Sequence, residues 1–238
     1  MKKLNIIAML LIAMIACMCA SCVFFPIMGN GKLVSYEKDF SAFDKIDSGG
    51  SADVRFHESP EYRAVVTTDS NLVEYVDIKV RNNKLFIGTK NCRSCSFTEW
   101  IVDVYCPKLS GVSMSGSGTF KGMDTISVST FSSSVSGSGK INGTIECDTF
   151  RGDISGSGRI NIDGNCYDSN INISGSGRFN GYEFFTNNAV VHVSGSGKAF
   201  VYVSDHLKAT VTGSGEINYQ GNPIVNSNIT GSGRIKKY

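Results

Sequence analysis

A positive charge directly follows a Gly-Ser-Gly triplet in four consecutive copies of a repeat. The residues after the seven triplets are, in order, Thr119, Lys140, Arg159, Arg178, Lys198, Glu216 and Arg234. If the copies stack like neighbouring strands, these side chains lie about 5 Å apart, where like charges repel one another. We therefore predict a strip that binds an acidic glycan or lipopolysaccharide, formed by Lys140, Arg159, Arg178 and Lys198. The alternative is a row of long, solvated side chains splayed from a tight corner.

Cysteines that could form a disulfide or bind a metal lie in the middle of the chain, at Cys92, Cys95 and Cys106. In an exported protein the Cys92-x-x-Cys95 spacing favours a local disulfide. A redox pair or half a metal site is the alternative, with Cys106 as the only nearby third ligand and no histidine close in sequence. We predict neither a metal site nor a cofactor.

A second pair, Cys147 and Cys166, follows the last glycine of two adjacent triplets by eight residues in each case. The two cysteines should therefore occupy equivalent places in neighbouring copies. Neighbouring strands are about 4.8 Å apart, within the Cα separation that a disulfide accepts. A pair of stacked core thiols is the alternative, and we favour it because Phe185 stands at the same offset one copy later.

Paired carboxylates, the usual basis of polysaccharide cleavage, are not brought together by the repeat. General acid–base chemistry needs two groups within reach of one bond. The histidines are scattered, at His57, His192 and His206. The column three residues before the triplets reads Ser113, Ser134, Asp153, Asn172, His192, Thr210 and Asn228. We predict no catalytic residues and no enzyme; a polysaccharide-active enzyme is the remote alternative.

The elements that would position these side chains follow from the spacing of the triplets, which recur every 18 to 21 residues. An apolar residue stands two positions before and two positions after every triplet, and apolar and polar residues alternate around it. Alternation with a period of two and β-branched residues indicates strands, and a glycine permits the tight corner between them. The repeats therefore predict an all-β fold, a parallel β-helix of about seven coils over residues 111–238.

The preceding segment, residues 39–110, has strand patterns but no triplet. Asn82-Asn83 between Val76–Val80 and Lys84–Thr89 predicts a hairpin. We expect this N-terminal portion to close one end of the stack, because an uncovered end exposes unpaired strand edges.

The first residues form a leader that predicts export. Met1-Lys2-Lys3 precedes an apolar run that is too short to span a bilayer as an ordinary helix. The run ends in Cys19-Ala20-Ser21-Cys22, which resembles a bacterial lipobox. We predict a lipoprotein signal peptide over residues 1–22 with lipidation at Cys22, and Cys17 as the alternative; a plain cleaved signal peptide is the other option. Residues 23–38 show no sustained period and are predicted to be a tether.

Net charge argues against nucleic acid as a partner. The formal charge of +2 comes from Lys2 and Lys3 in the leader, so the rest of the chain is neutral overall. The expected partners are membrane lipid, through the lipid anchor, and a glycan or protein ligand on the cell envelope.

Two features carry a family resemblance. The first is the Ser-Gly-Ser-Gly-x-Ile-Asn repeat, as in Lys140-Ile141-Asn142-Gly143. The second is a set of segments before the repeats: 29–34 (Gly-Asn-Gly-Lys-Leu-Val), 43–46 (Phe-Asp-Lys-Ile), Asp53-Val54 and 85–87 (Leu-Phe-Ile). In these segments, over residues 29 to 235, the chain resembles the bacterial autotransporter adhesin head, or GIN, domain. The resemblance implies an exported Bacteroidetes-type protein with a β-helical fold. The chain departs from the pattern at Phe200, where the repeat has Asn, and in having Cys92, Cys95 and Cys106.

Two kinds of function follow. The first is a non-catalytic adhesin or glycan-binding module, anchored by lipid in the envelope, at the outer membrane. The second is a periplasm-facing structural or signalling component. Val23-Phe24-Phe25 carries none of the acidic residues that often mark surface export, and this slightly favours an inward-facing protein.

Overall fold

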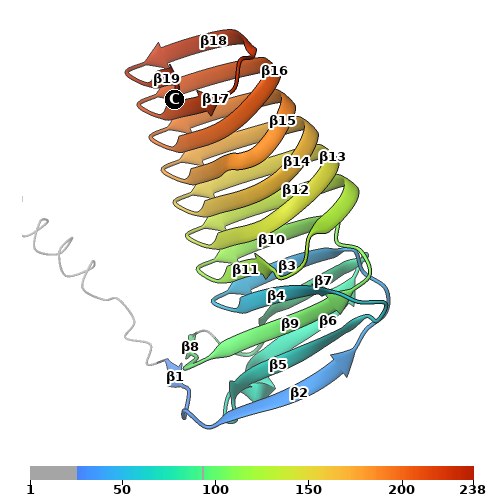
Figure 1. Ribbon diagram of the computed structural model, residues 1–238. Helices are drawn as coiled ribbons and strands as arrows, with labels where there is room; N and C mark the ends of the chain where they lie inside the picture. Colours follow the sequence, from blue (N-terminus) through green and yellow to red (C-terminus); the bar gives the residue numbers. More distant parts are fainter. Residues whose placement is uncertain (1–25, 93) are drawn as a thin grey trace, which may run out of the picture.

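The computed structural model describes residues 26–92 and 94–238. The leader prediction, including Cys22 and Cys17, lies outside the described residues. Figure 1 shows a column of stacked coils with a group of N-terminal strands at one end. The described chain is almost entirely β-strand, apart from the short 3-10 helix η1 (Val73–Tyr75). The predicted all-β, β-helical fold is confirmed.

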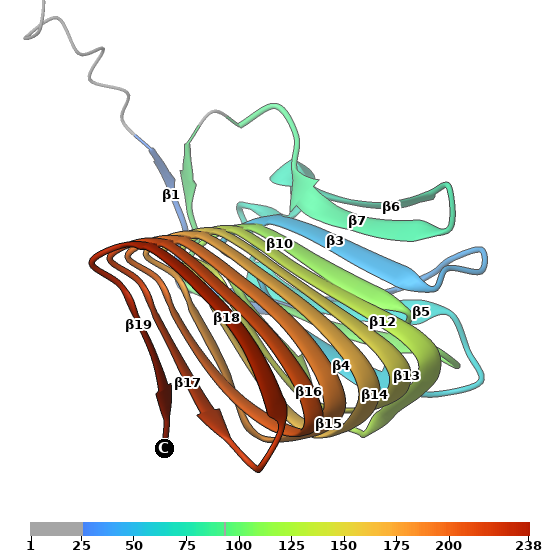
Figure 2. The same ribbon diagram turned by 90° about the horizontal axis from the view of Figure 1, so that it is seen from above.

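The coils are built from strands that pair in parallel with the equivalent strand one repeat away. The first glycines of the seven triplets, from Gly116 to Gly231, are directly in register. Seen along the stack in Figure 2, the coils superimpose, each with two legs that meet at the triplet corner. The strands of this part are β10 (Gly111–Gly116), β11 (Thr119–Gly122), β12 (Ile126–Gly137), β13 (Lys140–Gly156), β14 (Arg159–Gly175), β15 (Arg178–Gly195), β16 (Lys198–Gly213), β17 (Glu216–Gln220), β18 (Ile224–Gly231) and β19 (Arg234–Lys237).

Glycine is required at the corner for two reasons, which Gly156 illustrates. Its φ is +110°, a conformation that L side chains rarely adopt. A Cβ built on it would lie 2.8 Å from the carbonyl oxygen of Gly137 in the preceding coil. Each corner therefore packs backbone directly on backbone.

The core lies between the two legs of the coils. The apolar residues flanking the triplets, such as Ile154 and Ile160, are buried in successive coils. In this core Phe150 packs against three further buried phenylalanines: Phe131, Phe179 and Phe184. The same cluster of buried side chains continues from Phe43 to Ile217, so the N-terminal portion and the coils share one core.

The N-terminal portion begins the stack with an irregular coil of its own, β3 (Lys45–Gly50) and β4 (Asp53–Glu58). These strands pair in parallel with β10 and β11, and Gly50, at φ +86°, is in register with Gly116. Figure 1 shows them directly beneath the first triplet coil. This corner reads Gly49-Gly50-Ser51-Ala52, so it does not share the Gly-Ser-Gly pattern of the later corners.

Antiparallel strands complete this end of the molecule. β5 (Arg63–Asp69) pairs with β9 (Trp100–Cys106), which in turn lies beside β4. β6 (Val76–Arg81) and β7 (Lys84–Thr89) form the predicted hairpin, with Asn82 and Asn83 both at positive φ. A small separate sheet joins β1 (Ile27–Met28) to β8 (Cys95–Ser96).

The tether prediction for residues 23–38 is wrong for its second half. Residues Leu33–Asp39 form β2, which pairs antiparallel with β5 along its whole length. The pairing partner lies 24 to 36 residues further along the chain, so no local periodicity marks this strand. Among the described strands β2 pairs with β5 alone, and its side chains are mostly exposed.

Candidate functional site

The predicted basic strip (Lys140, Arg159, Arg178 and Lys198) is assembled by the register of the coils. Each residue is the first of its strand, and the four are direct neighbours across β13, β14, β15 and β16. Each backbone N–H donates to a glycine carbonyl in the preceding coil, at 3.0 Å in all four cases. All four side chains are exposed. The backbone therefore holds the cations in a regular row with a step of about 4.8 Å.

Compensating charge lies at one end of the strip. Lys198 Nζ is 3.2 Å from Glu216 Oε2, and the guanidinium of Arg178 lies over the ring of Phe200 at 5.3 Å. The hydrogen bond with Lys198 lowers the pKa of Glu216. Within residues 26–92 and 94–238, neither Lys140 nor Arg159 forms an ion pair. The uncompensated charge is thus concentrated at the first half of the strip.

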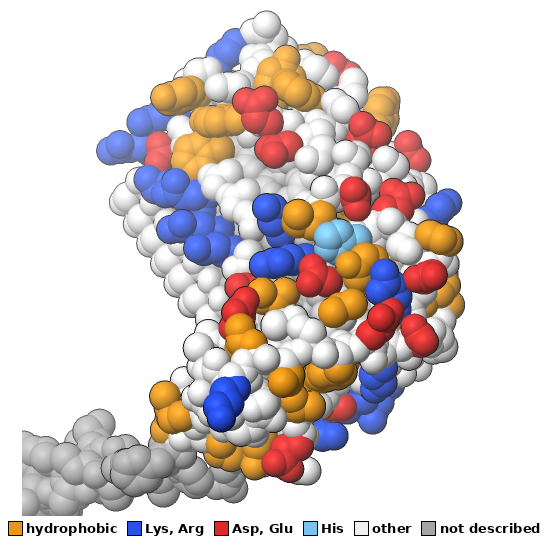
Figure 3. Space-filling model, turned by 60° about the horizontal axis from the view of Figure 1, so that its bottom comes forward, with side chains coloured by type: hydrophobic (Ala, Val, Ile, Leu, Met, Phe, Trp, Pro, Cys, Tyr) orange, Lys and Arg blue, Asp and Glu red, His pale blue; other side chains and the backbone are white. Residues whose placement is uncertain are grey.

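The cationic surface continues beyond the strip onto two residues that sequence reasoning missed. Lys121 of β11 pairs with Asn142, and Arg55 of β4 pairs with Lys121. Both are exposed and line a hollow of about 300 Å³ with Asp53 and Thr119. Lys121 stands three residues after its triplet, so the repeat could have revealed it; Arg55 belongs to the irregular coil. Figure 3 shows Lys and Arg side chains gathered on one side of the stack.

An uncharged row of amides runs beside the strip, two residues further along each strand. Asn161 donates to the side-chain oxygen of Asn142 at 2.7 Å, Asn180 donates to Asn161, and Asn142 donates to the carbonyl of Phe120 at 3.2 Å. The row ends at Phe200, the position where the chain departs from the repeat. These bonds link β11, β13, β14 and β15 and stiffen the surface next to the cations.

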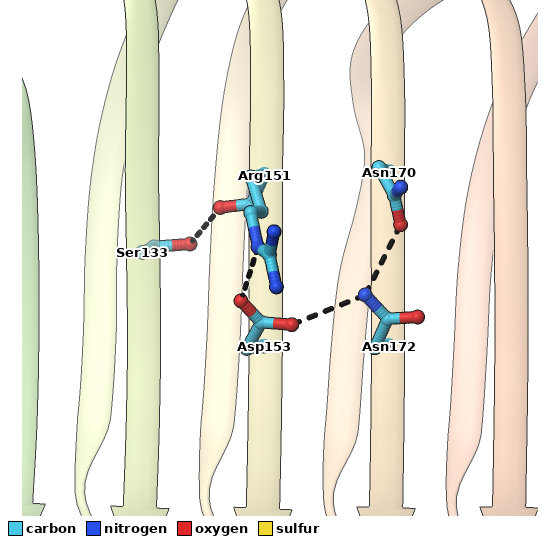
Figure 4. A network of polar contacts seen from close by, with 5 residues as sticks. All are labelled: Ser133, Arg151, Asp153, Asn170 and Asn172. Carbon is cyan, nitrogen blue, oxygen red and sulfur yellow. Dashed lines mark hydrogen bonds and ion pairs between the residues drawn. The ribbon is translucent and has the colours of Figure 1, made fainter.

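The leg of each coil that precedes the triplet carries the polar column three residues before it. Asp153, Asn172 and His192 are in register on adjacent coils. Figure 4 shows the one carboxylate of this group already engaged: Asp153 binds Arg151 Nε at 2.7 Å and Asn172 Nδ2 at 3.1 Å. Among the described residues, no group of three His, Cys, Asp or Glu side chains could hold a metal ion.

The cysteines fall into three different settings. Cys92 and Cys95 are joined by a disulfide, with Cα atoms 6.0 Å apart. Cys106 is fully buried in the core, and burial raises the pKa of its thiol to about 12. Cys147 and Cys166 are direct register partners, as their spacing predicts, and both are free thiols in the structure.

The alignment of Phe185 with these two cysteines is wrong. Cys166 pairs with Thr186, whereas Phe185 pairs with Asn165 and is 45% exposed. β15 has one residue more than β14, and the register shifts between Asn161 and Gly164 to accommodate it. A one-residue slip moves a side chain to the other face of a strand, so Phe185 points outward.

A family model described as "Putative auto-transporter adhesin, head GIN domain" matches residues 42–223. The chain belongs to this family. Membership supports an adhesion role for this GIN domain and a place in the cell envelope or at the cell surface. No helix among the described residues is long and apolar enough to cross a membrane. No curated protein sequence matches the chain.

Solved structures of similar proteins share the fold. A "putative lipid binding protein" from Parabacteroides distasonis ATCC 8503 is 27% identical, with a TM-score of 0.76 over 90% of this chain and 100% of the other. A "putative adhesin" from the same organism is 28% identical, with a TM-score of 0.74 and the same coverage. A "putative adhesin" from Bacteroides fragilis NCTC 9343 is 21% identical, with a TM-score of 0.83 over 89% and 100% of the chains. These descriptions name binding or adhesion and no enzymatic activity.

Proposed function

We propose that this GIN domain is a non-catalytic binding module of the cell envelope whose basic strip holds an acidic polysaccharide. The observation that carries the proposal is the row of four exposed cations at a constant step, three of them without an ion pair in the described part of the chain. A polymer with regularly spaced anionic groups can neutralise such a row one charge at a time. Binding would be driven by charge and would therefore weaken with salt.

Immobilised heparin and lipopolysaccharide are suitable polyanionic probes for the purified protein. Replacing Lys140, Arg159, Arg178 and Lys198 together by Ser should weaken binding roughly 30-fold or more, since each exposed charge contributes up to about 1 kcal/mol. The matched control removes four exposed cations elsewhere: Arg81, Lys84, Lys90 and Lys208. The control has the same net charge as the strip variant and should bind nearly as well as the parent. Equal retention of parent and strip variant would overturn the proposal.

We also propose that the domain is attached to the membrane through a lipidated Cys22, with Cys17 as the alternative residue. Two or more acyl chains at one cysteine hold a protein on a bilayer far better than a single chain does. Mass spectrometry of the mature N-terminus tests this: a diacylglyceryl cysteine as first residue is expected, and an unmodified peptide that begins elsewhere contradicts it. Protease shaving of intact cells then separates a surface adhesin from the inward-facing structural or signalling component.

The relative described as a putative lipid binding protein adds a reason to include lipopolysaccharide among the probes. The phosphates of lipopolysaccharide and the acidic groups of a polysaccharide offer the strip the same chemistry. Comparing intact lipopolysaccharide with its delipidated polysaccharide distinguishes them: retention of the polysaccharide alone assigns recognition to the glycan.

A further inference from the structure

The second turn of the coils, opposite the triplet corner, carries an open groove of about 870 Å³. In Figure 2 this turn is the end of the coils remote from the triplets, near the link between β17 and β18. The groove crosses the middle of β12 to β16, half a coil away from the basic strip. None of the four strip residues lines it, so it is a separate surface.

Aromatic rings from three successive coils line this groove: Tyr167 of β14, Phe185 of β15 and Tyr202 of β16. Tyr167 is 58% exposed and Phe185 is 45% exposed. The rings of Phe185 and Tyr202 meet edge to face, with centroids 4.8 Å apart, and this contact holds Phe185 in place. The three rings thus line one groove across successive coils, and those of Tyr167 and Phe185 are open to solvent.

Hydrogen-bonding groups with spare capacity lie beside the rings. Glu146 accepts a bond from Ser127 at 3.2 Å, and neither Glu146 nor Asp148 takes part in an ion pair within the described ranges. An ionised carboxylate accepts several hydrogen bonds, and the Asn165 amide can both donate and accept. Among the described residues, Lys108 is the only cation that lines the groove. The lining is therefore weakly acidic and rich in acceptors.

We propose that this groove binds a neutral oligosaccharide laid along the stack axis. A pyranose ring has an apolar face of C–H groups that suits the electron-rich faces of Tyr167 and Phe185. Its rim of hydroxyls supplies the donors that Glu146 and Asp148 accept. A polyanion would be repelled by the same carboxylates, and an apolar peptide would bury them without partners, which is costly. The domain thus carries two surfaces that sort glycans by charge.

Calorimetric titration of the full chain with cellohexaose, chitohexaose and mannohexaose, at low and high salt, tests the proposal. At least one of these probes should bind, with an affinity that salt hardly changes, because the ligand is uncharged. Phe185→Asn and Tyr167→Asn should each weaken binding roughly tenfold, the scale of a lost aromatic contact. Asn already occupies the register position of Phe185 in the neighbouring coil, at Asn165, so that substitution suits the strand.

Two further variants separate recognition from folding. Asp148→Asn keeps the size of the side chain and should also weaken binding, whereas Tyr238→Asn removes an exposed ring that does not line the groove and should leave binding unchanged. Heparin retention by the same samples reports on the basic strip and should be unaffected by the ring variants. Failure of all three hexasaccharides to bind, or binding that survives both ring substitutions, would overturn the proposal. Binding that disappears with the strip variant would overturn it too.

Discussion

The first glycine of each triplet is the residue on which the regularity of the stack depends. At the residue scale its role is steric: the positive φ and the carbonyl of the preceding coil both exclude a side chain. Each cation of the basic strip lies three residues after this glycine, and its backbone N–H donates to a glycine carbonyl of the preceding coil. Any change that displaces the corner would displace the cation as well.

Replacing Gly156 by Ala should therefore destabilise the protein by about 3 kcal/mol, because a strained φ adds to a close backbone contact. Gly88→Ala is the matched control: φ there is not positive, and a Cβ would meet nothing within 4 Å. The control should be neutral or slightly stabilising. Urea denaturation of both variants measures the difference, and equal stabilities would show that the corner can rearrange.

Counting residues from the triplet predicted the Cys147–Cys166 pair correctly but misplaced Phe185. The pairing of Cys147 with Cys166 followed from counting residues after the triplet, because the two coils have the same length between these points. Phe185 could not be placed in this way, since one extra residue in β15 shifts the register. As a result the Phe185 ring is exposed, and it is one of the three rings that line the groove at the second turn of the coils.

At the scale of elements, the buried carboxylate of Asp69 fastens the N-terminal strands together. It accepts hydrogen bonds from the backbone N–H of Gly31 and of Thr98, both at 2.8 Å, and so links the start of β2 to the segment before β9. Burial works to raise the pKa of this carboxyl, but the backbone hydrogen bonds together outweigh it and the pKa is lowered. Sequence patterns gave no sign of this residue, since it ends an ordinary strand.

Asp69→Asn should lower stability by about 2 kcal/mol at neutral pH, because an amide has one acceptor oxygen where two N–H groups need one each. A carboxylate whose pKa is lower in the folded than in the unfolded protein stabilises the fold at pH values above its unfolded pKa, which is near 3.9 for Asp. This stabilisation is lost as the pH falls through the folded pKa. The difference between parent and variant should therefore shrink in acid. Thermal unfolding across pH measures it, with the exposed Asp39→Asn as control. A difference that is constant with pH would contradict this account.

Long-range pairing decided which segments became elements at this end. β2 pairs with β5, whose own partner is β9, and these contacts span tens of residues. The hairpin of β6 and β7 was predictable because its turn, Asn82-Asn83, is local. β2 was not predictable, because an exposed edge strand has no alternating buried face.

At the scale of the whole molecule, the two ends of the stack differ. Antiparallel strands cover the N-terminal end, whereas among the described strands β18 pairs only with β16 and β19 only with β17. The apolar residues of this last coil show the consequence: Ile229 is 45% exposed, although its equivalents Ile173 and Val211 are 1% and 0% exposed. Stability in a stacked repeat is set mainly by contacts between neighbouring coils.

Hydrogen exchange should therefore be fastest in β18 and β19 and slowest in β13 and β14, which are paired on both sides. Mass spectrometry of peptides after timed exchange measures this gradient. The N-terminal strands β4, β5 and β9 provide the internal comparison, because they should exchange more slowly than the last coil. Protection of β18 equal to that of β14 would mean that the C-terminal end is covered in solution.

The sequence by itself determined the coils, their corners and the basic strip. These features repeat at a nearly constant spacing, so stacking of the coils places residues from the same position of each repeat side by side. The tertiary structure alone decided the pairing of β2, the extension of the cationic surface to Arg55, and the aromatic groove. Each of these depends on contacts between segments without a common period, or on a single inserted residue, and such contacts leave no mark in local sequence patterns.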